Sequence, residues 1–382
     1  MAHTDPNTPY NTMPHLPPTA DIETVRIWRV CAEAKTSLAR MREAGKLIPN
    51  QGILISSIPL LEATASSRIE NIFTTSNALY TALSVPEEKI DPATKEVLRY
   101  REALSVGVGE LKSGRKPGEI LLTRVCSVLL DRDTDRRSPN TGTYIKGPEG
   151  RVYTPPDDPI VVEDLIHQLE DYMNGGREPD PLIRLALIHY QFEAIHPFGD
   201  ANGRTGRILN ILYLIDQDLL DIPILYLSRY IIQHKSEYYS RLRRVTENEE
   251  WEEWIIFMLN AVRETADWTY DRISAIKTLM DETIAVCKEK LPKIYSYDLV
   301  EEIFLQPYCK PAFLVERGIG NRQTAMKYLK ALEEIGVLAS VRIGKERIYV
   351  NTKLFELLKF EEEVVCPSLQ AKDGRGLLPT GR

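Results

Sequence analysis

Apolar residues recur with a helical period along most of this chain, so the predicted elements are mainly helices. A first helix is expected over residues 22–45, where Gly45 ends the pattern. Its apolar stripe is Val25, Trp28, Ala32, Leu38 and Met41. A second helix is expected over residues 57–83, ended by Pro86. Its inward positions are Leu60, Leu61, Ile69, Ile72 and Leu79.

The helical pattern resumes at residue 92 and is interrupted once by a stretch of strand type. Residues 92–132 predict two helices separated by the loop SGRKPG. In TGTYIKGPEGRVYTPPDD, two short β-type runs flank the turn KGPEG, which predicts a hairpin followed by a Pro-Pro stop. Later helices are expected at residues 161–174, 181–195, 204–218, 236–250 and 251–282.

Residues 294–358 have the element order of a separate C-terminal module. Two helices, YSYDLVEEIFLQ and CKPAFLVERG, precede the turn GIGN, a helix over 322–336 and a two-stranded ribbon that turns at Gly344. This order describes a winged helix, for which we expect a domain over residues 285–360. The chain ends are expected to be a flexible, extended arm and a loose tail, at residues 1–20 and 361–382.

Composition narrows the class of protein. Of 382 residues, 43% are hydrophobic and 27% are charged, which is typical of a globular protein of two or three domains. No run approaches the roughly 18 apolar residues of a membrane helix and no signal segment is evident, so we expect a cytoplasmic protein without membrane contact. The net charge of −7 argues against nucleic-acid binding by the chain as a whole. The spacing of the five cysteines predicts reduced thiols and no zinc site: Cys31, Cys126, Cys287, Cys309 and Cys366.

The stretch HPFGDANGRTGR at residues 196–207 is not explained by core packing. Its small residues let backbone N–H groups approach an anion at the start of a following helix. Arg204 and Arg207 can clamp phosphate oxygens. Asp200 suits Mg²⁺, and His196 can accept a proton near neutral pH. The combination predicts phosphoryl or nucleotidyl transfer, although each residue also has an ordinary structural interpretation as core, turn or surface.

The same stretch resembles the signature of the Fic (filamentation induced by cAMP) family, HPFx[DE]GNGRxxR. It departs at one fixed position, Ala201, where the family usually has Gly. Ala can donate its N–H there unless the backbone needs a positive φ. The similarity also includes IHYQFEAI, the Pro-Pro after the hairpin, EYYSRL and WEEWIIFML. It implies a mainly α fold with a Fic-type catalytic core over residues 111–275, a hairpin flap, an N-terminal helical domain over residues 21–110 and the C-terminal winged helix.

Fic enzymes transfer AMP from ATP to protein hydroxyl groups, and the resemblance implies roles for single residues. His196 is the catalytic base that deprotonates a Ser, Thr or Tyr of a target protein or of the chain itself. Asp200 holds Mg²⁺ on the phosphates, and Phe198 is a buried anchor. Arg204 and Arg207 bind the β and γ phosphates. The implied ATP-binding residues are Glu70, His196, Ala201, Asn202, Gly203, Arg204, Thr205, Gly206, Arg207, Tyr238 and Tyr239, with one of the two tyrosines expected to be core.

The hairpin and an upstream motif complete the resemblance. Strand addition of a target segment to the flap is implied for the hairpin residues Gly150, Arg151, Val152 and Tyr153. SSRIEN at residues 66–71 fits the family's inhibitory pattern [ST]xxxE[GN], with Ser66, Glu70 and Asn71. Ser66 and Glu70 share a helix face. The implication is that Glu70 pairs with Arg207 and takes the place of the γ phosphate, so that the basal rate is low.

Other functions remain open at this point. The ribbon and its preceding helix carry six basic residues against three acidic ones: Arg322, Lys327, Lys330, Arg342, Lys345 and Arg347 against Glu333, Glu334 and Glu346. A DNA-binding regulator with a nucleotide-sensing core is therefore a rival hypothesis. The enzyme could instead use another donor, or mainly remove AMP from modified targets. A homodimer is expected from the family.

Overall fold

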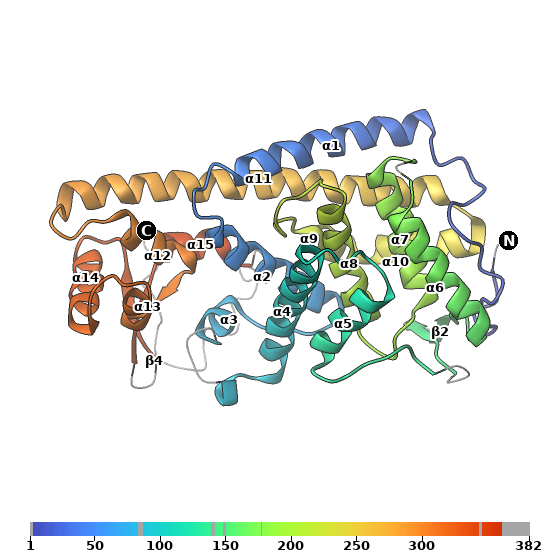
Figure 1. Cartoon of the computed structure of the whole chain (residues 1–382), viewed down its shortest axis with the longest axis horizontal. Helices are drawn as coiled ribbons and strands as arrows, with labels where there is room; N and C mark the ends of the chain where they lie inside the picture. The colour runs from blue at the N-terminus through green and yellow to red at the C-terminus, as the bar shows by residue number, and fades with distance from the viewer. Residues whose placement is uncertain are drawn as a thin grey trace. The chain divides into compact units, whose positions relative to one another are not determined.

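A computed structural model gives the fold of residues 3–82, 87–138, 142–147, 150–176, 178–343 and 346–360. The fold class is mainly α, as predicted, with two small antiparallel sheets (Figure 1). The chain forms two compact units, and the predicted N-terminal domain contributes to both. Unit 1 is Met1–Ala44, Ile58–Phe73 and Lys95–Tyr270; unit 2 is Gly45–Ser57, Thr74–Thr94 and Asp271–Arg382.

Most predicted helices are present with small changes at their ends. The helices are α1 (Val25–Gly45), α2 (Gly52–Ile69), α3 (Ser76–Ala82), α4 (Pro92–Lys112), α5 (Glu119–Leu130), α6 (Pro159–Asn174), α7 (Pro181–Ile195), α8 (Asn202–Asp216), α9 (Leu227–Gln233), α10 (Lys235–Asn248), α11 (Trp251–Lys290), α12 (Tyr297–Leu305), α13 (Pro311–Glu316), α14 (Arg322–Glu334) and α15 (Thr352–Leu358). The strands are β1 (Ile145–Gly147), β2 (Gly150–Tyr153), β3 (Tyr308–Cys309), β4 (Ala339–Ile343) and β5 (Glu346–Val350). The sequence did not predict α9, α15 or β3.

Helices α7 and α8 form the centre of unit 1. Asp180 caps α7 by accepting a hydrogen bond from the N–H of Leu182 at 3.0 Å, and Pro181 occupies the first turn. Nearly every side chain of both helices is buried, so neither shows the one-sided stripe of a surface helix. Trp254 of α11 donates its indole N–H to the Ala186 carbonyl at 2.8 Å, which fixes α11 on α7.

The predicted stripe of α1 was partly wrong. Val25 and Trp28 are 87% and 40% exposed, and Ala32 is exposed as well. The buried stripe is shifted along the helix, and its fully buried members are Ile27, Cys31, Ala34, Leu38 and Met41. This face lies alongside α11 (Figure 1), where Arg26 and Arg263 also form ion pairs between the two helices.

The single helix predicted over residues 57–83 is two helices. α2 ends at Ile69, Asn71 has a left-handed backbone with φ 62°, and α3 begins only at Ser76. A left-handed residue stops an α-helix, and Asn tolerates it better than other residues with a side chain. The predicted stop at Pro86 lies outside the described residues.

Among its described residues the N-terminal arm has turns and no helix or strand, and the structure corrects its predicted flexibility. Tyr10, Met13 and Leu16 are at most 6% exposed. The N–H of Tyr10 donates to the Thr154 carbonyl at 3.1 Å, next to the hairpin. Buried apolar side chains and a hydrogen-bonded backbone hold this segment on unit 1. The loose tail predicted for residues 361–382 lies outside the described residues.

The hairpin and the C-terminal sheet have the predicted order. β1 pairs with β2 through Ile145–Tyr153, Lys146–Arg151 and Gly147–Gly150. In unit 2, β4 pairs with β5 in the ribbon that follows α12, α13 and α14, and β3 adds a third strand on the other side of β5. The predicted turn at Gly344 lies outside the described residues.

Two composition-based expectations can be compared with the described residues. Cys31, Cys126, Cys287 and Cys309 are free and buried, while Cys366 lies outside this part of the chain. None of the described helices is both long and apolar enough to cross a bilayer.

Candidate functional site

The loop between α7 and α8 carries the motif and is held at both ends. His196 directly follows α7 with a left-handed backbone (φ 51°, ψ 60°), and its N–H donates to the Phe192 carbonyl at 3.0 Å. Asn202 opens α8 and closes the loop on itself. Its side-chain amide accepts from the N–H of Phe198 at 2.9 Å and donates to the Phe198 carbonyl at 2.8 Å. Phe198 is 2% exposed, so the anchor role implied for it is consistent with its position.

Ala201 stands where the family signature usually has Gly, and its backbone has a positive φ. Its backbone is left-handed (φ 61°, ψ 17°) at the N-cap position of α8. This conformation costs an L-residue with a Cβ atom about 1–2 kcal/mol, whereas Gly adopts it freely. The loop therefore has the conformation that favours Gly, and it carries strain at Ala201.

The first turn of α8 presents backbone N–H groups, as a helix start does. The first intrahelical bond is from Thr205 to the Ala201 carbonyl at 2.9 Å. A Cβ atom added to Gly203 would lie 2.6 Å from Oε1 of Glu70 and 3.0 Å from Nη1 of Arg207. The bare Gly203 backbone therefore lets a carboxylate approach the start of α8. The side chain of Thr205 is fully buried.

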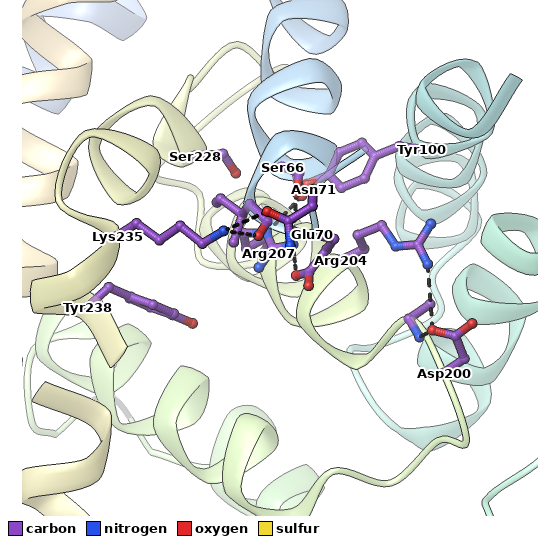
Figure 2. Close-up of polar contacts among 12 residues, drawn as sticks. Ser66, Glu70, Asn71, Tyr100, Asp200, Arg204, Arg207, Ser228, Lys235 and Tyr238 are labelled. Atoms are coloured by element: carbon purple, nitrogen blue, oxygen red, sulfur yellow. Dashed lines mark hydrogen bonds and ion pairs between the residues drawn. The ribbon is translucent and has the colours of Figure 1, made fainter. Parts of the chain in front are cut away.

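Arg207 holds the motif of Ser66 and Glu70, which the sequence predicts to be inhibitory, by three hydrogen bonds (Figure 2). Its Nε donates to Ser66 Oγ at 2.7 Å, and its Nη2 donates to the Ser66 carbonyl at 3.1 Å and to Glu70 Oε1 at 2.6 Å. Arg207 is 1% exposed, whereas the Glu70 side chain is 34% exposed, so the ion pair is shielded from water on the arginine side only. Burial acts to raise the pKa of Glu70, but the charge and the hydrogen bond of Arg207, together with the charges of Arg204 and Lys235, outweigh it and lower that pKa. Glu70 is thus held as a carboxylate.

The end of the motif is fixed by backbone geometry and by a lysine from α10. Asn71 provides the left-handed residue after α2, which explains why Gly or Asn fits this position. Lys235 donates to the Ile69 carbonyl at 2.6 Å and to Asn71 Oδ1 at 3.4 Å (Figure 2). A cation at the end of α2 also complements the helix dipole. Lys235 lies in no motif that would have singled it out.

Arg204 has carboxylate partners. Its Nη1 donates to Glu96 Oε2 of α4 at 2.9 Å, and its Nη2 lies 3.7 Å from Asp200 Oδ1. Asp200 also accepts from the N–H of Ala201, and its side chain is 62% exposed. No group of three or more His, Cys, Asp or Glu residues with metal-binding geometry occurs among the described residues. Asp200 is therefore an accessible carboxylate within the loop, which fits a cation held mainly by phosphate oxygens and water.

His196 is a neutral base at physiological pH. Burial lowers its pKa to about 4, the positive charge of Arg137 acts in the same direction, and the Glu193 carbonyl opposes both. The uncharged imidazole is the form that can accept a proton from a hydroxyl group.

His189 of α7, seven residues before His196, has a structural role. It is bonded to the Tyr238 hydroxyl at 2.8 Å and faces Asn210 at 3.2 Å, and burial lowers its pKa to about 3. Tyr238 is accordingly the core member of the predicted tyrosine pair. Tyr239 is 44% exposed and remains the accessible one.

Two carboxylates near Arg207 were not predicted, the half-buried Glu193 and the buried Glu62. Glu193 of α7 has an Oε1 atom without a hydrogen-bond partner, and a Cβ atom on Gly206 would lie 2.5 Å from it. Burial raises the pKa of Glu193 to about 7; Arg207 lowers it and Glu70 raises it. Glu62 of α2 accepts hydrogen bonds from Tyr100 and from the backbone of Ser228, at 3.1 and 2.8 Å. Only tertiary structure brings these groups together, although Glu62, Ser66 and Glu70 share a spacing of four residues.

Among the hairpin residues, Tyr153 anchors the hairpin and Arg151 lies on its exposed edge. The Tyr153 hydroxyl donates to the Ala194 carbonyl at 2.8 Å, so this side chain ties the hairpin to α7. Arg151 is exposed and its guanidinium lies 4.2 Å from the centre of the Tyr144 ring. Gly150 has φ 124°, which favours Gly at the start of β2.

Fold and site are those of a Fic-type protein, and comparisons with known families agree. Residues 28–109 match the model of the Fic/DOC family N-terminal region, and residues 124–214 match that of the Fic/DOC family. Residues 279–354 match the C-terminal domain of the protein adenylyltransferase SoFic-like group. The chain is therefore built of Fic/DOC family domains followed by a SoFic-like C-terminal domain.

Individual relatives are similar over part of their length. A protein of Aquifex aeolicus (strain VF5) named "Probable protein adenylyltransferase" is 28% identical over 222 residues, which are 56% of this chain and 62% of that protein. Protein adenylyltransferase fic-1 of Caenorhabditis briggsae is 31% identical over 97 residues, 24% of this chain and 18% of that protein. The chain thus spans less than two thirds of these curated relatives. The crystal structure of a Fic family protein from Desulfovibrio desulfuricans G20 shares the fold, with a TM-score of 0.52 at 21% identity over 86% of this chain and 96% of that one.

Proposed function

We propose that this chain is a protein adenylyltransferase that transfers AMP from ATP to a Ser, Thr or Tyr hydroxyl of a target protein or of itself. The observation that carries the proposal is one loop with a neutral base at one end and an anion site at the other. His196 follows α7, while the first turn of α8 presents free N–H groups beside Arg204 and Arg207. The names of the relatives support the same reaction.

The residues have complementary tasks in this reaction. His196 accepts the hydroxyl proton while the oxygen attacks the α-phosphorus of ATP and pyrophosphate leaves. Backbone N–H groups at the start of α8 and the two arginines stabilise the negative charge of the phosphates. Asp200 is the residue that would hold Mg²⁺ together with the phosphates. When bound, Mg²⁺ supplies further neutralisation of phosphate charge.

Glu70 acts as a brake on this reaction. Its carboxylate lies over Gly203 and on Arg207, where it competes with the terminal phosphate for the same cation. Its negative charge also repels the triphosphate. Removal of Glu70 therefore frees Arg207 for the nucleotide, and we expect the rate to rise.

The test uses the full chain with Glu70→Gly and ATP labelled on either the α or the γ phosphate. The proposal expects protein-bound label from the α phosphate alone, and its loss when His196→Ala is added. Label from the γ phosphate would show phosphate transfer instead. Undiminished α label in the double variant would remove His196 as the base.

The rival functions have less support from the site. A pure nucleotide sensor has no need of a neutral base in the loop. In the C-terminal module, Arg347 is bonded to Glu333 at 2.7 Å, which reduces the predicted basic surface. Arg322, Lys327 and Lys330 are exposed on α14. DNA binding by the winged helix, a homodimer and preferential AMP removal stay predictions.

A further inference from the structure

Arg137 contacts the two segments that the proposed reaction has to align. Its Nε donates to the His196 carbonyl at 2.8 Å, and its Nη2 donates to the Pro156 carbonyl and, at 3.4 Å, to that of Ile195. Its backbone N–H donates to the Pro197 carbonyl at 2.9 Å. One residue thus bonds to the base loop and to the chain that leaves the hairpin.

The carbonyls at the end of α7 need such a donor. The last carbonyls of a helix have no intrahelical partner, and the left-handed backbone of His196 turns the chain away from the helix axis. A positive side chain at this end also interacts favourably with the helix dipole. Arg137 therefore stabilises the strained backbone conformation that aims the imidazole.

The hairpin is attached at the same place. β2 ends at Tyr153, whose hydroxyl donates to Ala194, and the chain continues through Thr154 and Pro155 to Pro156. Proline has no N–H group, so Pro156 can be held here only through its carbonyl or its packing. Arg137 supplies the donor for that carbonyl.

We propose that Arg137 is a positioning residue that holds the His196 loop and the target-docking hairpin in one fixed arrangement, so that base and acceptor hydroxyl are aligned. The inference rests on the proposed function. It concerns alignment and not nucleotide binding, because none of the Arg137 contacts within the described part of the chain reaches the start of α8. A misplacement of reacting groups by about 1 Å can reduce a rate on the order of 100-fold.

The neighbouring Arg136 provides a matched control. Its Nε lies 2.6 Å from Glu119 of α5, and its backbone pairs with Phe198 as an isolated bridge. Its side chain therefore forms an ion pair outside the base loop. The planar fork of Arg137 bonds several carbonyls at once, which the single ammonium group of Lys cannot do. Arg137→Lys thus keeps the positive charge and loses the simultaneous bonds to several carbonyls, while Arg137→Gln loses both.

The two variants also separate geometry from electrostatics. Burial is the main cause of the lowered His196 pKa, and the charge of Arg137 is the next. Arg137→Gln should therefore raise the pH at which His196 titrates, and Arg137→Lys should leave it nearly unchanged. A merely structural residue would not give this pattern.

The experiment places Arg137→Lys, Arg137→Gln and Arg136→Lys in the full chain with Glu70→Gly. We would measure kcat and the KM for ATP from α-labelled self-modification, and follow the His196 imidazole by NMR as a function of pH. The expected result is a fall in kcat of roughly tenfold or more for both Arg137 variants, with the KM for ATP within about twofold. Arg136→Lys should match the parent. Thermal unfolding identifies any variant that does not fold. If Arg137→Gln does not fold, the test rests on Arg137→Lys.

Three results would overturn the inference: an unchanged kcat in the folded Arg137 variants, an equal loss in Arg136→Lys, or a fall in kcat matched by a large rise in the KM for ATP. Absence of AMP transfer in the Glu70→Gly parent would instead contradict the proposed function. In that case the NMR titration still decides the Arg137 inference. A His196 titration that is unchanged in Arg137→Gln would show that Arg137 does not act on the base.

Discussion

Three residues around the site have a left-handed backbone, at Asn71, His196 and Ala201. Asn tolerates this conformation through its short polar side chain. The backbone of His196 is held by hydrogen bonds at both its N–H and its carbonyl. Ala201 has no comparable compensation from its side chain. Strain at the site is therefore concentrated where the chain departs from the family signature.

Ala201→Gly should consequently stabilise the protein. Relief of the left-handed strain outweighs the greater freedom of Gly in the unfolded chain, and we expect a gain of about 0.5–1 kcal/mol in the free energy of unfolding. Ala285→Gly, at an exposed position inside α11, is the control and should cost about 1 kcal/mol. Urea unfolding measures both. A loss of stability in Ala201→Gly would contradict the assigned strain.

Glu193 should make stability depend on pH. Its folded-state pKa of about 7 lies above the ordinary value of 4.5, so the folded state binds its proton more tightly than the unfolded state. The stabilisation is complete below pH 4.5 and is lost as the pH rises towards 7. The loss is roughly 1.4 kcal/mol for each pH unit in this window.

Glu193→Gln tests this prediction because the amide does not titrate. The free energy of unfolding of Glu193→Gln, relative to that of the parent, should rise from pH 5 to pH 7 and change little at higher pH. The exposed Glu282→Gln variant is the control. A difference between Glu193→Gln and the parent that is constant with pH would show that Glu193 is not held protonated by its surroundings.

At the scale of elements, local signals explain which predictions were right. α7 and α8 were located because the small residues of the loop interrupt the helical pattern between them. α9 and α15 have seven residues each, too few to show a helical period. The break after Ile69 was missed because the apolar pattern continues across it, and only the left-handed Asn71 stops the helix.

The position of α2 depends on a buried carboxylate two turns before Glu70. Glu62 accepts hydrogen bonds from Tyr100 of α4 and from Ser228 of α9, and it is 1% exposed. Glu62→Gln would place a side-chain N–H donor opposite groups of Tyr100 and Ser228 that themselves donate to Glu62. We expect a loss of about 1–3 kcal/mol in stability and a rise in basal AMP transfer smaller than that of Glu70→Gly.

Thr64→Val is the matched control on the same helix, because the Thr64 hydroxyl bonds only to the Leu60 carbonyl of α2 among the contacts described. It should leave the basal rate unchanged. Measurement of α-labelled self-modification distinguishes the two. An unchanged basal rate in a folded Glu62→Gln protein would show that Glu62 does not position the inhibitory helix.

At the scale of the whole molecule, the residues that the sequence identified lie in two short motifs, in the hairpin and in a tyrosine pair, and the residues it missed lie in none of these. The contact between Glu70 and Arg207 spans 137 positions and was predicted through the family resemblance. Glu96, Arg137 and Lys235 reach the site from other elements, each without a motif of its own. Sequence patterns indicate which chemistry is present, whereas the partners of each charged group depend on how the helices pack.

The central claim is that Glu70 restrains an adenylyltransferase by holding Arg207. The most direct test compares initial rates of AMP incorporation from α-labelled ATP in the parent chain, Glu70→Gly and Glu70→Gly with Arg207→Ala. We predict a rise of at least roughly tenfold on removal of Glu70, equivalent to about 1.4 kcal/mol, and a return towards the parent rate when Arg207 is also lost. Equal rates in the parent and Glu70→Gly would contradict the account.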